Sequence, residues 1–316
     1  MQRTTLVVLV LAMLAAVLAL GCSGRSTKIK LATGPQGGTW YPLGGALKSA
    51  LEKQLNDVSV QVLPGGGIAN VKAVESGQAD IAFANSVSTV DGINGQPPFD
   101  TKTTNVCNVA TLYPQYFQAV ALADAGIDGP ADFKGKALGT QPKGNTGEAI
   151  TAHLLKVYGL TYDDLARVNY GSYTDSVTLM KDGNAQIFTL GTAIPAGAVM
   201  DLASARDIKI ISISDDAFDK MKALNSGYQK TVIPAGTYPG QDQDAVTIGY
   251  ATHVIARCNL DGTLVAGLLD SILASLDNFA TVAKAMQNIT AQGMAQDIGV
   301  PMHPAATDWY KNKAAS

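Results

Sequence analysis

Charged residues are scarce in this 316-residue chain, and so are the histidines and cysteines that hold metals or act as nucleophiles. Only 16% of the residues are charged, and the net charge of -3 is too small to predict a nucleic-acid-binding surface. The three histidines, His153, His253 and His303, lie far apart, so no paired metal-binding spacing such as H-E-x-x-H occurs. We therefore expect no metal, no cofactor and no nucleic-acid partner.

Sequence motifs for catalysis are missing as well. The chain contains no G-x-S-x-G motif for a nucleophilic serine, and the segment GPADFKGKA at residues 129–137 lacks the spacing and the hydroxyl residue of a P-loop. No cysteine adjoins a plausible base. We expect a protein that is not an enzyme. A hydrolase with two paired carboxylates stays open, because separation in sequence does not fix distance in space.

The residues that are abundant predict a globular fold with many turns. Hydrophobic residues make up 47% of the chain, which is enough for a sizeable core. The 32 glycines, together with only 6% aromatic residues, suit tight connections between strands and helices better than an aromatic-cored β-sandwich.

The amino terminus has the pattern of an export signal. An uncharged apolar run at residues 6–20 follows the basic Arg3. A membrane-spanning helix needs about 20 apolar residues, so this shorter run predicts a signal peptide over residues 1–21 and a tether over residues 22–27. Cys22 follows Gly21 as in the lipobox of bacterial lipoproteins, which predicts lipidation, with plain cleavage as the alternative. We expect a periplasmic or cell-surface protein that meets the membrane only through this lipid anchor.

The other two cysteines, Cys107 and Cys258, are a candidate disulfide. An even pair in an exported protein is more often bridged than free, although two buried thiols remain the alternative. Cys107 opens one strand-like run and Cys258 closes another. If these runs pair antiparallel with the cysteines opposite each other, Pro114 falls opposite Ala251 and Val120 opposite Ala245.

Strand-like and helix-like patterns alternate along the rest of the chain, which predicts an α/β fold with parallel strands. One series of such units begins at Lys28 and a second follows the strand-like stretch 109–123. The segment 92–104 interrupts the pattern and is interpreted as a surface excursion. We expect two lobes joined by two hinge strands. Lobe I would comprise residues 28–115 and 248–316, and lobe II residues 116–247.

The candidate ligand-binding residues lie in loops that follow the predicted strands, because open α/β sheets bind ligands beyond the carboxyl ends of their strands. In the first loop, Gly37, Gly38 and Thr39 precede a helix, whose free N–H groups and positive end suit a carboxylate. The alternative is a tight turn in which Thr39 only caps the helix. The glycine-rich loop PGGGIAN at residues 64–70 is a weak nucleotide-binding fingerprint.

Later loops add amides, hydroxyls and two charged side chains. Ser86 is equally a helix cap, and the tyrosines are equally ordinary packing residues. The chain has only five arginines and none lies in a candidate loop, so we expect backbone N–H groups to hold an acid, helped by Lys143, with Asp175 as the partner of an ammonium group. The complete set of candidates is Gly37, Gly38, Thr39, Trp40, Tyr41, Asn85, Ser86, Tyr113, Gln115, Lys143, Asn145, Thr146, Tyr173, Asp175 and Thr192.

Several segments together resemble the TAXI family of solute receptors for TRAP (tripartite ATP-independent periplasmic) transporters. They include TGPQGGTWYPLGGAL at residues 33–47 and, most specifically, IPAGTYPGQDQD at residues 233–244. The resemblance covers nearly the whole mature chain. It implies a two-lobed periplasmic-binding-protein-like (type II) fold with two hinge strands. It also implies a receptor that passes a small organic acid, a glutamate-like amino acid or a dicarboxylate, to the TRAP membrane subunits.

The chain departs from the TAXI pattern at two places. Residues 144–147 read Gly-Asn-Thr-Gly where the family often has Gly-Ser-Gly-Thr, and Gln115 stands where an acidic residue often follows the proline. The second difference predicts a shifted preference for ligand charge. An exported sensor module or an enzyme on the same two-lobed scaffold is the alternative function.

Overall fold

The computed structural model describes residues 26–34 and 38–314. Within these residues, ten strands form one mixed sheet. The strands are β1 (Thr27–Ala32), β2 (Val58–Leu63), β3 (Ile81–Asn85), β4 (Val106–Leu122), β5 (Ala137–Thr140), β6 (Arg167–Tyr170), β7 (Ile187–Thr192), β8 (Ile208–Ile210), β9 (Gln229–Ile233) and β10 (Ala245–Arg257). Strand β1 thus begins at Thr27, one residue inside the expected tether.

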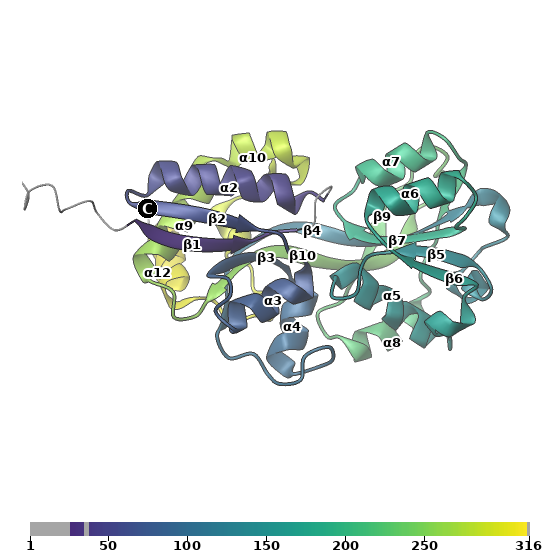
Figure 1. Cartoon of the computed structure of the whole chain (residues 1–316), viewed down its shortest axis with the longest axis horizontal. Coiled ribbons are helices and arrows are strands. Elements are labelled where there is room, and N and C mark those ends of the chain that lie inside the picture. The colour runs from purple at the N-terminus through teal and green to yellow at the C-terminus, as the bar shows by residue number, and fades with distance from the viewer. Residues whose placement is uncertain (1–25, 35–37, 315–316) are drawn as a thin grey trace, which may run out of the picture.

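Helices cover both faces of the sheet at each end (Figure 1). They are α2 (Trp40–Gln54), α3 (Gly67–Glu75), α4 (Ser86–Asn94), α5 (Thr146–Val157), α6 (Tyr173–Lys181), α7 (Gly197–Ala203), α8 (Asp215–Leu224), α9 (Gly262–Ala274), α10 (Leu276–Val282), α11 (Ala291–Met294) and α12 (Pro304–Ala314). Among the described residues no single helix is both long and apolar enough to cross a membrane; α9 and α10 meet that test only as a pair, bent by 69°.

The strand order, β2-β1-β3-β10-β4-β7-β5-β6, places a parallel group at each end. β1 pairs in parallel with β2 and β3, and β5 pairs in parallel with β6 and β7. The predicted β-α-β units are therefore confirmed. We call the end with β1–β3, α2–α4 and α9–α12 lobe I, and the end with β5–β9 and α5–α8 lobe II.

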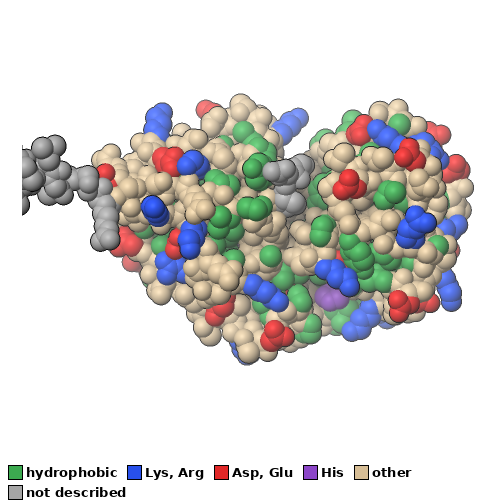
Figure 2. All heavy atoms as spheres, in the orientation of Figure 1, with side chains coloured by type: hydrophobic (Ala, Val, Ile, Leu, Met, Phe, Trp, Pro, Cys, Tyr) green, Lys and Arg blue, Asp and Glu red, His purple; other side chains and the backbone are tan. Residues whose placement is uncertain are grey.

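The two lobes are joined by the long antiparallel strands β4 and β10 (Figure 1). Each strand contributes to the cores of both lobes. On β4, Val109 packs in the core under α2 and α9, whereas Phe117 packs in the core under α5. On β10, Val254 packs in the core under α2 and α9, and Ile248 packs in the core under α5. The expected pair of hinge strands is therefore confirmed. In Figure 2 the upper outline of the molecule is notched between the two lobes.

The pairing of the hinge strands agrees with the expected register only near their middle. Ala251 lies opposite Pro114, as predicted. Two β-bulges then shift the register toward the cysteines, so Ala256 and not Cys258 opposes Cys107. The predicted bridge is nevertheless present, with the two Cα atoms 5.0 Å apart.

The predicted pair Val120 and Ala245 is wrong. Beyond the middle of the hinge the two strands separate and find new partners. Val120 pairs with Phe188 of β7 and Ile210 of β8, while Ala245 pairs with Ile233 of β9. In lobe II, β4 and β10 thus hydrogen-bond to strands of that lobe and no longer to each other, so their backbone groups remain paired.

The interpretation of residues 92–104 as a surface excursion is also partly wrong. Helix α4 extends through Gly92 to Asn94, and its residues from Ser86 to Gly92 are all buried. Phe99, in the following loop, packs in the core of lobe I. This helix buries polar residues such as Ser88, Thr89 and Asp91 along with its valines, so polarity does not mark its buried face as it does in a surface helix.

Candidate ligand-binding site

A cavity of about 150 Å³ lies beside the hinge strands and is lined by both lobes. Nine of the predicted residues line it: Gly38, Thr39, Trp40, Asn85, Gln115, Asn145, Thr146, Tyr173 and Thr192. The sequence analysis missed the others, which are Gly34, Gly66, Gly67, Gln141, Pro142, Gly171, Ser172, Thr174 and Gly191. Gln141 directly follows β5, so the rule that ligands meet the carboxyl ends of strands could have found it.

The two charged candidates do not line the cavity. Asp175 is exposed, and its carboxylate accepts hydrogen bonds from the hydroxyl and the backbone N–H of Ser172, which lower the pKa of Asp175. It therefore caps α6 and is not placed to pair with an ammonium group. Lys143 is also exposed, and its Nζ lies 5.4 Å from the centre of the Tyr170 ring. Both charged side chains thus face solvent and not the cavity.

Three uncharged candidates also lie outside this cavity. The Ser86 hydroxyl accepts a hydrogen bond from the backbone N–H of Ala251, so it ties α4 to the hinge. Tyr113 is buried among core residues of lobe I, and Tyr41 is one of the exposed large side chains. Gly37 lies outside the described residues. Packing is therefore the role of Tyr113, whereas Tyr41 faces solvent.

The amino-terminal ends of five helices meet at the cavity. Their N-cap residues all line it: Thr39 for α2, Gly66 for α3, Asn85 for α4, Asn145 for α5 and Ser172 for α6. Only the last of these makes a side-chain cap hydrogen bond. The first N–H groups of a helix have no partner within the helix and carry its positive partial charge. The arrangement favours an anion without any cationic side chain.

The lining of the cavity includes amides and hydroxyls, exposes more apolar than polar surface, and carries no formal charge. All 18 lining residues are uncharged, and the three residues of the nearby loop that the structure does not describe, Pro35, Gln36 and Gly37, are uncharged in the sequence. The three described arginines do not line the cavity either. As expected from the sequence, no guanidinium is placed to clamp a carboxylate there.

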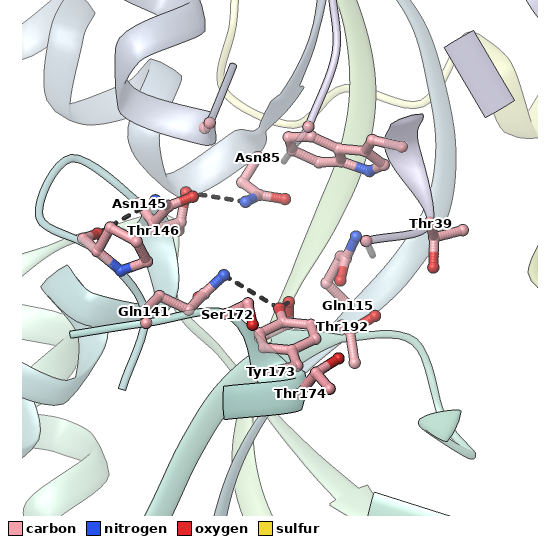
Figure 3. A pocket seen from close by; sticks show the side chains of 18 residues that line it. Thr39, Asn85, Gln115, Gln141, Asn145, Thr146, Ser172, Tyr173, Thr174 and Thr192 are labelled. Atoms are coloured by element: carbon pink, nitrogen blue, oxygen red, sulfur yellow. Dashed lines mark hydrogen bonds between the residues drawn. The ribbon is translucent and has the colours of Figure 1, made fainter. Parts of the chain in front are cut away.

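Buried polar atoms without hydrogen-bond partners surround the cavity. They include Oδ1 of Asn85, Oε1 of Gln115, Oε1 of Gln141 and the indole N–H of Trp40. Figure 3 shows the amides of Asn85 and Gln115 pointing into the open space. Leaving a buried polar atom unpaired costs about 1–3 kcal/mol. A ligand that completes these hydrogen bonds would therefore gain binding free energy.

A glycine-rich loop lets the lobes approach closely across the cavity. A Cβ atom on Gly67 would lie 2.0 Å from Oγ1 of Thr146, and one on Gly66 would lie 2.7 Å from Oδ1 of Asn145. The side chain of Asn70 fixes this loop by binding the backbone N–H of Gly66 and two backbone carbonyls of lobe I. The glycines of the loop PGGGIAN therefore allow the start of α3 in lobe I to lie close to the start of α5 in lobe II.

Hydrogen bonds also link the lobes directly. Asn85 Nδ2 donates to Oγ1 of Thr146 at 2.8 Å, and the hydroxyl of Ser88 lies 2.8 Å from the same oxygen. Farther from the cavity, Asn225 Nδ2 in lobe II donates to the carbonyl of Val87 in α4 at 3.0 Å. These contacts describe a closed arrangement of the two lobes, because each one crosses between them.

An acidic side chain is buried at this second contact between lobes. Asp91 on α4 is 8% exposed and faces Asn225 and Tyr228 of lobe II. Burial raises the pKa of Asp91 to about 7, although a hydrogen bond from Asn225 opposes the shift. The folded protein therefore keeps a proton that the unfolded chain releases near pH 4.

We predict that Asp91→Asn removes a pH-dependent loss of stability. In the parent the free energy of unfolding should fall as pH rises from about 4 to 7, because the folded state binds the extra proton in that window. At pH 8 the variant should be more stable by about 1–3 kcal/mol, and at pH 4 the two should be alike. Urea unfolding of both proteins at pH 4 to 8 measures this. Parallel pH profiles for the two proteins would show that Asp91 ionises freely.

Comparison with known proteins places the chain in a family. Residues 31–313 match the model of the NMT1-like family. The chain belongs to the NMT1-like family. The match covers nearly all of the described residues, so it includes both lobes, the hinge and the cavity.

Solved structures with a similar fold include two proteins of low sequence identity. PhnD1 from Prochlorococcus marinus, in complex with methylphosphonate, is 14% identical with a TM-score of 0.55, and the alignment covers 91% of this chain and 96% of that one. A putative L-cystine ABC transporter protein from Listeria monocytogenes is 12% identical with a TM-score of 0.51, covering 83% and 97%. This family member has the expected two-lobed, periplasmic-binding-protein-like fold.

Proposed function

We propose that this protein is an extracytoplasmic solute-binding receptor that captures a small organic acid between its lobes. The observation that carries the proposal is the meeting of five helix N-termini at one uncharged cavity between the lobes. Each N-terminus offers free N–H groups and a positive partial charge. A cavity of about 150 Å³ can hold a molecule about the size of benzene, so a short carboxylic acid fits.

Capture works by hinge closure around β4 and β10. Lobe I is residues 28–115 and 248–316, and lobe II is residues 116–247. In the open form the acid enters from solvent and binds the helix ends of one lobe. Closure adds the helix ends of the other lobe and direct contacts such as Asn85 to Thr146, so the ligand shifts the population toward the closed form.

The partner of the closed form is a membrane transporter of the TRAP type. This follows from the TAXI-like segments, above all residues 233–244, while the relatives with solved structures include a phosphonate complex and a protein named as an ABC transporter. The receptor acts in the periplasm or at the cell surface, held there by a lipid on Cys22 after removal of residues 1–21. Those residues and Cys22 lie outside the described part of the chain.

A thermal-shift screen of carboxylic acids, amino acids, sulfonates and phosphonates tests the receptor function. A binding protein gains stability with its ligand by mass action and leaves it chemically unchanged. We expect stabilisation by one group of small acids, with full recovery of the acid by mass spectrometry. Conversion of the acid would instead support an enzyme on this scaffold, and a lack of response to every compound would contradict the proposal.

Single alanine substitutions at the cavity should weaken binding of the acid found in that screen. Thr39→Ala and Asn85→Ala each remove a polar group at a helix N-cap, so each should cost about 1–3 kcal/mol of binding free energy. Isothermal titration calorimetry measures the change. Thr281→Ala, on the exposed face of α10, is the matched control and should bind like the parent. Parental affinity in both cavity variants would remove these residues from the site.

A further inference from the structure

The residues that line the cavity bear on whether its ligand can carry an ammonium group in addition to a carboxylate. This inference rests on the proposed function, because it concerns the ligand of the same cavity. Two independent observations bear on it. One is the charge of everything that lines the cavity, and the other is the set of buried amide oxygens that lack partners.

A buried ammonium group would find no countercharge among the described lining residues. The acidic side chains closest in the sequence to the lining are engaged elsewhere. Glu148 accepts a hydrogen bond from the hydroxyl of Tyr162, and Asp175 caps its own helix. The five helix N-termini add positive potential to the same space. Because burying an unpaired charge costs several kcal/mol, the cavity disfavours a cation.

The ligand must nevertheless donate hydrogen bonds. Asn85 is 6% exposed and Gln115 is 4% exposed, and each has an amide oxygen without a partner. Their amide nitrogens are already engaged, by Thr146 and Thr252 respectively. Figure 3 shows both amides directed into the cavity. A carboxylate alone cannot satisfy these oxygens, since it only accepts hydrogen bonds, whereas a neutral hydroxyl can donate to one of them.

We infer that the ligand is a short hydroxy acid, with its carboxylate at the helix N-termini and its hydroxyl donating its one proton to the amide oxygen of Asn85 or that of Gln115. A hydroxyl provides the missing donor without bringing a positive charge into the cavity. An amino acid of the same skeleton provides the donor only together with an uncompensated charge. The unsubstituted acid brings neither the charge nor the donor.

Matched sets of acids test this inference. Each set keeps one carbon skeleton and varies one group as hydroxyl, hydrogen or ammonium: malate, succinate and aspartate, and likewise 2-hydroxyglutarate, glutarate and glutamate. In calorimetry with the parent protein, the hydroxy acid of the set that fits should bind about tenfold more tightly than the unsubstituted acid. It should bind at least about 100-fold more tightly than the amino acid.

Gln115→Glu supplies the missing countercharge and should reverse the preference. The substitution keeps the shape of a buried side chain that points into the cavity, so the amino acid should gain affinity relative to the hydroxy acid. Asn85→Ala, which keeps the cavity neutral, is the matched control. It should weaken binding of all three acids, because the contact from Asn85 to Thr146 between the lobes is lost, and it should leave the amino acid the weakest ligand. Circular dichroism of each variant establishes that it is folded.

The outcomes separate the inference from the proposed function. Tightest binding of an amino acid by the parent would overturn the inference and leave the receptor function standing. Equal binding of the hydroxy and unsubstituted acids would also overturn it. If no carboxylic acid of either set binds, and none does in the wider screen, the receptor function itself fails.

Discussion

Gly67→Ala is expected to abolish ligand-driven closure and to weaken binding of the ligand by at least about 100-fold, since closed-lobe contacts worth several kcal/mol would be lost. The added Cβ would lie 2.0 Å from Oγ1 of Thr146 in the other lobe, far inside van der Waals contact. The lobes must then stay farther apart than in this structure. Within its own lobe the alanine begins α3, where it is a better helix former than glycine.

The measurement pairs calorimetry with small-angle X-ray scattering. Ligand should reduce the radius of gyration of the parent and leave that of Gly67→Ala unchanged, while the thermal stability of the ligand-free variant stays at or above that of the parent. Gly45→Ala is the matched control, because a Cβ at this α2 position meets no neighbouring atom within 4 Å. Closure of Gly67→Ala with parental affinity would contradict the role assigned to the loop.

A second substitution should restore closure. Thr146→Ala removes the hydroxyl that the new methyl group would strike, and the Cβ of residue 146 lies 3.4 Å away. The amide nitrogen of Asn85, 3.1 Å from the new Cβ, has to shift slightly, and it can do so once its hydrogen bond to Thr146 is gone. The double variant should therefore become compact again with ligand in the scattering experiment. Its affinity should remain below that of the parent, because the hydrogen bonds from Asn85 and Ser88 to Thr146 are lost.

Removal of the disulfide is expected to lower stability by up to about 5 kcal/mol in the chain-entropy description of cross-links. Cys107 and Cys258 are 151 residues apart, and the segment between them contains the whole of lobe II. The bridge holds together the two ends of that segment even when the chain is unfolded. Its loss therefore frees an unusually long loop, since the entropy of closing a loop grows with loop length.

Chemical unfolding of the parent, with and without a reducing agent, measures this effect. The variant Cys107→Ala/Cys258→Ala should match the reduced parent and should not respond to the reductant. Ligand affinity should change little, because neither cysteine lines the cavity. Two free thiols in the untreated protein, or unfolding curves that coincide under both conditions, would contradict the prediction.

Much of the fold could be predicted from local patterns. The alternation of strands and helices identified the parallel groups β1–β3 and β5–β7, and two long strand-like runs identified the hinge. Helix α4 escaped prediction because it buries Ser88, Thr89 and Asp91 together with its valines, so polarity did not mark its buried face. The bulges of β4 also escaped, because register depends on partners that local sequence does not specify.

The sequence predicted which kinds of residue and which loops form the site, but not which individual residues line the cavity. Asn85 and Ser86 are neighbours at the end of one strand, yet only Asn85 lines the cavity, while Ser86 binds the hinge backbone. For Asp175 a local clue existed and was missed, because Ser172 and Asp175 have the spacing of a capping box, which engages the carboxylate with its own helix.

The sequence by itself determined that helices begin after strands, that their first turns carry glycines, hydroxyls and amides, and that no arginine accompanies them. These are properties of neighbouring residues, so they follow from local propensities and spacing. Only the tertiary structure decided that five of these helix ends share one uncharged cavity and that Gly67 has to be a glycine. The physical reason is that both depend on atoms of the opposite lobe, which the hinge brings into contact.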